Sequence, residues 1–173
     1  MDIRKQHVHK MPKNKRVYCT HTTEIHAPAG KVFTLLCPVA EYDWIDGWDC
    51  NLVFTESGAN EEGCIFTEEL MGPVLAGSTA STTWITNRYN EENRHIQFVI
   101  FVHDKAVVRY DVTLTDRDKG LTRAEMNFEI TAMNDEIGHL SDEDIRARLM
   151  VIVEFLAKAL KHYCETGEIL KAA

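Results

Sequence analysis

The sequence predicts an α+β domain in which a curved, seven-stranded antiparallel sheet wraps around a long C-terminal helix, with two short helices after the first strand. Three features support this fold. Residues 141–167 carry apolar side chains every three or four positions, as an amphipathic helix does. Most of the chain before them alternates apolar and polar residues, which is typical of half-buried strands. Pro28 and Pro38 bracket a short apolar segment that favours a helix.

The predicted C-terminal helix has residues typical of both ends. Ser141 and Asp144 match a capping box, and Gly167 is a natural stop for the last turn. At a rise of 1.5 Å per residue, the helix would be about 35 Å long, so its apolar face needs a broad partner surface. That face is predicted to consist of Ile145, Leu149, Ile152, Leu156, Leu160 and Tyr163.

The strands are predicted where β-branched and aromatic residues alternate with polar ones. They cover residues 17–26, 51–56, 64–71, 79–89, 94–103, 107–115 and 121–132. A short helix is expected between Pro28 and Pro38, and a second one over residues 39–44. No parallel crossover is needed, because each later strand follows the previous one through a short turn.

The strand over residues 94–103 carries apolar side chains on both faces. An odd number of residues in the turn around Asp104 would direct Phe98 and Ile100 inward, whereas an even number would direct Gln97 and Val99 inward. Both registers stay open at this point. Apolar residues on the outer face of this strand would also suit a homodimer.

Composition favours one ordinary domain over residues 17–173, preceded by a flexible basic arm over residues 1–16. The arm has six Lys or Arg and one Asp, whereas the rest of the chain has 13 basic and 26 acidic residues. Such an acidic body argues against a nucleic-acid partner, which would need a basic surface.

The chain has neither an apolar run of the ~20 residues that a membrane span needs nor a signal-peptide core, so we expect a cytoplasmic protein. The five cysteines form no CxxC pair and are expected to be reduced. The sequence also lacks HExxH, Walker, GxSxG and GxGxxG signatures, and we expect neither a cofactor nor a metal site.

Residues 41–50, with the sequence EYDWIDGWDC, form the most unusual local stretch. Trp44 and Trp48 alternate there with Asp43, Asp46 and Asp49. The stretch is either a hydrophobic plug under a polar loop or the amphipathic rim of a cavity or partner-binding patch.

The order of elements is the helix-grip arrangement, and residues 17–168 resemble the SRPBCC superfamily, also called START-related or Bet v 1-like, which includes polyketide cyclase-like and lipid-transfer proteins. The resemblance rests on EIHAPAGKVFTLL at residues 24–36, the two tryptophans at 44 and 48, EEGCIFT at 61–67, AEMNFEITAM at 124–133 and the terminal helix. The stretch LLCPVAEYDWIDGWDC at 35–50 looks closest to bacterial members with no established activity.

This resemblance implies a cavity between the concave face of the sheet and the long helix, because a strongly curved sheet and a helix cannot pack closely along their whole length. The side chains expected to bind a ligand there are Trp44, Trp48, Phe66, Trp84, Phe98, Tyr110, Met126, Phe128, Leu149, Val153 and Leu156. The candidate catalytic residues are His21, Glu68 and Tyr110, which would act as a general acid-base pair and a hydrogen-bond donor. Burial would raise the pKa of Glu68.

Three functions remain compatible with the sequence. The first is binding or carriage of a small hydrophobic molecule such as a lipid, a polyketide or an aromatic metabolite. The second is a polyketide cyclase-like or hydratase-like enzyme that uses the same cavity. The third is a protein-interaction module like the co-chaperone branch of the superfamily, which would use the outer sheet face or the loop around Trp44 and Trp48.

Overall fold

The computed structural model describes residues 15–71, 79–117 and 120–171, and in this part of the chain seven strands form a single antiparallel sheet. The strand order is β1-β7-β6-β5-β4-β3-β2, so β1 and β2 are the two edges. The strands are β1 (Arg16–Ile25), β2 (Cys50–Phe54), β3 (Ile65–Met71), β4 (Thr79–Asn90), β5 (His95–Val102), β6 (Ala106–Asp116) and β7 (Thr122–Ala132). All seven predicted strands are confirmed.

Four helical segments accompany the sheet. They are α1 (Ala29–Thr34), the 3-10 turn η1 (Ala40–Asp43), α2 (Asp135–Gly138) and α3 (Asp142–Thr166). The two short helices after β1 are therefore confirmed, although the second is a 3-10 turn. The sequence did not predict α2, a single turn that Asn134 caps by accepting a hydrogen bond from the Ile137 backbone.

The ends of α3 follow the sequence signals. The Ser141 hydroxyl accepts a hydrogen bond from the Asp144 backbone N–H at 3.0 Å, and Gly167 has a left-handed φ of 76° that a larger residue rarely adopts. The buried face differs from the prediction: Val153, Ala157 and Cys164 are buried where Ile152, Leu156 and Tyr163 were expected, and the latter three are only partly buried. The helix packs along a ridge of residues four apart, which rotates its contact face relative to the expected one.

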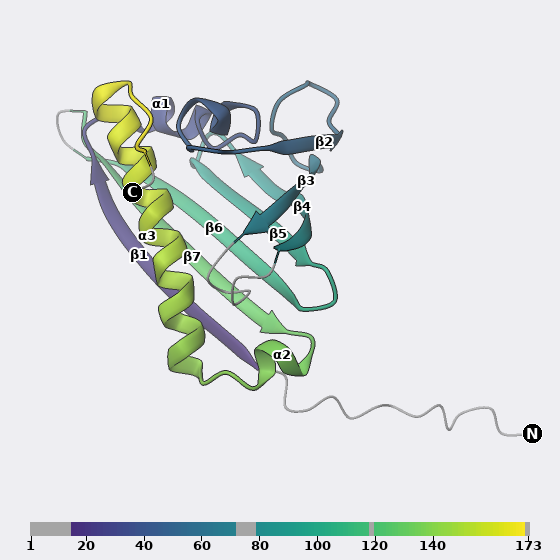
Figure 1. Cartoon of the computed structure of the whole chain (residues 1–173). Coiled ribbons are helices and arrows are strands. Elements are labelled where there is room, and N and C mark those ends of the chain that lie inside the picture. Colours follow the sequence, from purple (N-terminus) through teal and green to yellow (C-terminus); the bar gives the residue numbers. More distant parts are fainter. Residues whose placement is uncertain (1–14, 72–78, 118–119, 172–173) are drawn as a thin grey trace, which may run out of the picture.

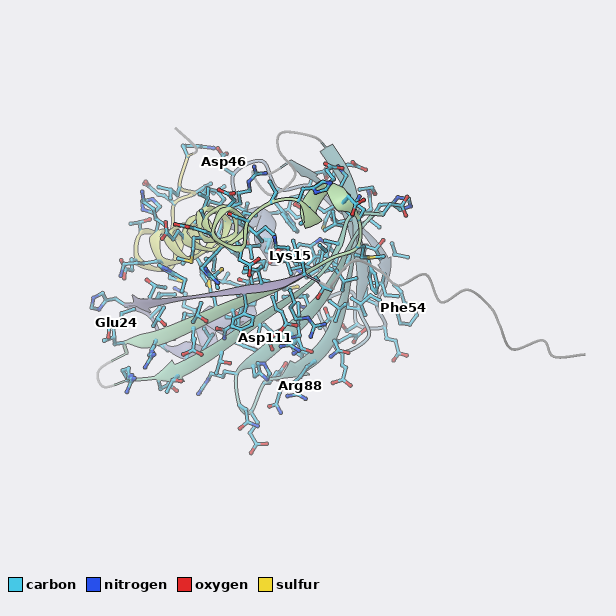
Figure 2. All side chains as sticks on the ribbon, turned by 90° about the horizontal axis from the view of Figure 1, so that it is seen from below. Lys15, Glu24, Asp46, Phe54, Arg88 and Asp111 are labelled. Atoms are coloured by element: carbon cyan, nitrogen blue, oxygen red, sulfur yellow. The ribbon has the colours of Figure 1, made fainter. Side chains whose placement is uncertain are left out.

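Helix α3 packs on β1 and to a lesser extent on β7, so it covers one end of the inner sheet face rather than its centre. Figure 1 shows α3 running along β1, with β2 and β3 at the far edge of the sheet. The helices and the loop that carries Asp46 lie on one side of the sheet, and Arg88 and Asp111 lie on the other (Figure 2). The inner face over β3 to β6 is thus left to α1, η1 and the loops around them.

The turn after β5 decides which face of that strand is buried. Val102 pairs with Ala106, which leaves three turn residues, and Asp104 takes a left-handed φ of 55°. This odd-numbered turn directs Phe98 and Ile100 inward, as one of the two open registers required. His95 and Gln97 consequently face outward, where both contact Asp111.

The outer face of the sheet carries an apolar row that crosses β2 to β5. Phe54, Ile65, Ile85 and Val99 follow one another through the strand pairings, and Phe101 lies beside them. Phe54 is 52% exposed and Phe101 is 43% exposed. That a second subunit covers this row stays a prediction.

Residues 1–14 of the predicted basic arm lie outside the described residues, and Arg16 already belongs to β1. The five cysteines, all within the described part, are free thiols. No helix in the described ranges is long and apolar enough to cross a membrane.

Candidate functional site

A row of aromatic side chains crosses the inner face of the sheet from β3 to β7. Neighbouring rings lie 5.2 Å apart for Phe66 and Trp84, 5.5 Å for Trp84 and Phe98, 6.0 Å for Phe98 and Tyr110, and 4.2 Å for Tyr110 and Phe128. Three of these contacts join residues directly opposite each other on neighbouring strands, so strand register fixes the row. We call these five residues the aromatic ladder. Each is at most 9% exposed.

The segment before β2 continues the ladder at its β3 end. The Trp48 ring lies 6.4 Å from the Phe66 ring, and its indole N–H donates to the Pro38 carbonyl oxygen at 2.8 Å. The Trp44 indole donates to the Leu35 carbonyl oxygen at 2.9 Å, and this residue is only 2% exposed. Trp44 is therefore the plug and Trp48 the rim, so each of the two alternatives for this stretch describes one tryptophan.

Polar contacts fix the loop that carries these tryptophans. The Tyr42 hydroxyl donates to the Cys50 carbonyl oxygen and accepts from the Cys50 backbone N–H, both at 3.0 Å. Buried Asn60 donates to the Leu36 carbonyl oxygen at 3.0 Å and accepts from the Thr86 hydroxyl at 2.6 Å. These bonds tie η1 and its neighbours to β2 and β4, which makes the loop a rigid part of the site.

A cleft of about 300 Å³ opens where this loop meets β2 and β3. It is lined by Ile45, Asp46, Gly47, Trp48, Asp49, Asn51, Thr67, Glu68 and Glu69. Two residues predicted from the sequence, Trp48 and Glu68, line this cleft, and Trp48 also contacts the aromatic ladder. The cleft lies at the β2 end of the sheet, away from the region that α3 covers.

Glu68 lies two residues after Phe66 on β3 and shares its inward face. Burial raises the pKa of Glu68 to about 7, and a hydrogen bond from the Trp84 indole opposes part of this shift. Its Oε2 is buried and has no hydrogen-bond partner among the described residues. A buried oxygen without a partner is unfavourable and is found where a ligand can supply the missing contact.

Glu41, on η1, is the site residue that the sequence analysis missed. Burial raises its pKa to about 8, and the charge of Glu68 contributes to the shift. Burial also raises the pKa of Tyr110, and the charge of Glu41 adds to that effect. Electrostatic coupling of Glu41 to both groups means that the three lie in one poorly solvated region above the ladder.

The remaining predicted residues fall in two other places. His21 is half-buried on β1 opposite Met126 and lies five strand positions from β3, so the structure does not bring it to Glu68. Met126, Leu149 and Val153 are fully buried in the core, on β7 and on the packed face of α3, and Leu156 is partly buried. In the described ranges, no three His, Cys, Asp or Glu side chains form a group that could hold a metal ion.

The fold is similar to several solved structures at low sequence identity. A START superfamily protein from Mycobacterium smegmatis has a TM-score of 0.67 and 12% identity, over 86% of this chain and 97% of that protein. The Zhui aromatase/cyclase from Streptomyces sp. R1128 has a TM-score of 0.62 and 15% identity, over 87% and 94%. Norcoclaurine synthase from Thalictrum flavum, solved with dopamine and hydroxybenzaldehyde, has a TM-score of 0.63 and 9% identity, over 91% of both chains.

No protein-family model matches the sequence, and no curated protein is significantly similar to it. The likeness to solved structures therefore identifies the fold, which is the one that the sequence predicts. It leaves the ligand and any reaction to be argued from the site itself.

Proposed function

We propose that this chain, which has the helix-grip fold of START and Bet v 1-like proteins, binds a small aromatic molecule that enters through the cleft and lies against the aromatic ladder. The observation that carries this proposal is the continuous series of rings from Trp48 to Phe128, which begins at the cleft. Aromatic faces attract flat, apolar molecules, and the cleft volume is at the lower end of the range for small-molecule sites.

The ionisable groups favour a small molecule over a protein partner at this site. Glu41, Glu68 and Tyr110 are withdrawn from water, where a protein partner could not reach them through a cleft of about 300 Å³. They would instead contact the polar atoms of a bound molecule and fix its orientation. A cytoplasmic location and a lipid as the ligand stay expectations from the sequence.

Replacing Trp48 by alanine should weaken the binding of an aromatic probe such as naphthol about tenfold or more, because the ring at the rim is lost. Binding is measured by calorimetry and by quenching of tryptophan fluorescence. Phe101→Ala is the matched control, since Phe101 is an exposed ring on the opposite sheet face, and it should bind the probe like the natural protein. If the natural protein binds no aromatic probe, but Trp48→Ala removes a co-purifying protein, then the interaction-module alternative replaces this proposal.

A second candidate function is general acid-base catalysis on the bound molecule. The specific observation in its favour is that the carboxyl groups of Glu41 and Glu68 have pKa values of about 8 and 7, close to the range in which proton transfer is efficient. For each aromatic molecule that binds, mass spectrometry after prolonged incubation should detect a product if the chain is an enzyme. Glu68→Gln should then abolish the product and leave thermal unfolding nearly unchanged, whereas an unchanged rate would exclude this role for Glu68.

A further inference from the structure

The chemistry of the cleft narrows the class of molecule that it would hold. Four of its nine lining residues are acidic, namely Asp46, Asp49, Glu68 and Glu69, and none of the nine is basic. Asp46 is neutralised by Lys171 at 2.9 Å, and Asp49 accepts a hydrogen bond from the Tyr42 hydroxyl at 3.2 Å. The deeper carboxyl groups lack such compensation.

Glu68 and Glu41 are the uncompensated pair. No ion pair joins either group to a basic side chain of the described residues, and the two charges repel each other. The Glu68 Oε2 is in addition a buried oxygen without a hydrogen-bond partner in the described ranges. A buried carboxylate is strongly unfavourable unless a cation or several donors offset it, so this arrangement gains stability when a cation enters.

The walls around this pair suit an organic cation better than a metal ion. Trp48 lines the cleft beside Glu68, and Trp84 contacts Glu68 through its indole N–H. Tryptophan faces attract ammonium groups and also stack on rings, whereas a metal ion would require several converging oxygen ligands. One molecule with an ammonium group and an aromatic ring would satisfy both the carboxyl pair and the ladder.

We propose that the cleft selects a protonated aromatic amine, whose ammonium group lies between Glu41 and Glu68 and whose ring stacks on Trp48 and the aromatic ladder. This inference rests on the proposed function, since it names the class of aromatic molecule bound at the same site. A neutral ligand such as an alcohol or a carbonyl compound would instead accept a hydrogen bond from a protonated carboxyl group.

The two classes of ligand differ in the sign of their pH dependence. The acidic groups that face the ammonium position are Glu41 from η1, Asp46 and Asp49 from the loop, Glu68 and Glu69 from β3, Cys50 from β2 and Tyr110 from β6. Burial holds Glu41 and Glu68 largely protonated at pH 6, and a cation binds best when they are ionised. Amine affinity should therefore increase from pH 6 to pH 8.5, whereas affinity for a hydrogen-bond acceptor should decrease.

The test compares phenethylamine, phenethyl alcohol and phenylacetate by calorimetry on the full chain, with naphthol as the general aromatic probe. The expected result is that the amine binds about tenfold or more tightly than the alcohol, that phenylacetate does not bind, and that amine affinity rises about tenfold from pH 6 to pH 8.5. Glu68→Gln should remove most of this preference and of the pH effect. Glu92→Gln, an exposed carboxylate in the β4–β5 turn, is the matched control and should change neither.

The outcomes separate this inference from the proposed function. Equal binding of amine and alcohol, or tighter amine binding at pH 6, overturns the amine assignment while naphthol binding preserves the proposed function. Failure of naphthol and all three phenyl compounds to bind overturns both. If Glu68→Gln does not fold, Glu41→Gln gives the same readout, since its carboxyl group is the second member of the pair.

Discussion

Replacing Phe98 by alanine is expected to lower the free energy of unfolding by about 3–5 kcal/mol, the range for removing a large aromatic side chain from a packed core. Phe98 is 2% exposed and lies at the centre of the aromatic ladder. Its ring contacts those of Phe66, Trp84 and Tyr110 at 6.2, 5.5 and 6.0 Å. Alanine would leave a cavity between three rings held by strand pairing, which cannot close together to fill it.

Phe101→Ala provides the matched comparison on the same strand. Phe101 projects from the outer face of β5 and is 43% exposed, so its removal should change the free energy of unfolding by about 1 kcal/mol or less. Urea denaturation of both variants measures the difference. Equal losses for the two variants would contradict the inward register of Phe98 and with it the ladder.

The second large effect is a decrease of stability with rising pH. Glu41 and Glu68 have an unperturbed pKa of 4.5, and burial raises these values to about 8 and 7 in the folded chain. Between pH 4.5 and pH 8 the folded state therefore binds more protons than the unfolded state, so the free energy of unfolding falls as the pH rises. Because the Glu41 side chain is only half-buried, we expect a total loss of about 1–3 kcal/mol between pH 5 and pH 8.5.

The double variant Glu41→Gln, Glu68→Gln should remove this loss, because an amide stays neutral at every pH. It should equal the natural protein at pH 5 and exceed it by about 1–3 kcal/mol at pH 8.5. Glu61, Asp144 and Glu165 have lowered pKa values and affect stability in the opposite sense, but only below about pH 4.5. Denaturation curves of the double variant that run parallel to those of the natural protein from pH 5 to pH 8.5 would refute the buried carboxyl pair.

Local patterns in the sequence were sufficient to predict most of the fold. The alternation in β6 and β7 defines their buried faces, and Ser141 and Gly167 define both ends of α3, because each of these signals acts within a few neighbouring residues. The inward side chains Phe66, Trp84, Phe98, Tyr110 and Phe128 are correspondingly where the sequence analysis placed them, on the inner face of the sheet.

Tertiary structure alone decided how distant segments combine into the candidate site. The apolar face of α3 was predicted one helical ridge away from the one that is buried, because its orientation depends on packing against β1. Glu41 was missed since a 3-10 turn, fixed by bonds to β2 and β4, directs its side chain toward Glu68 and Tyr110. His21 was grouped with Glu68 by residue type, although strand order separates them. A sequence shows which face a side chain takes on its own element, whereas its distance from other elements depends on strand order and packing across the whole fold.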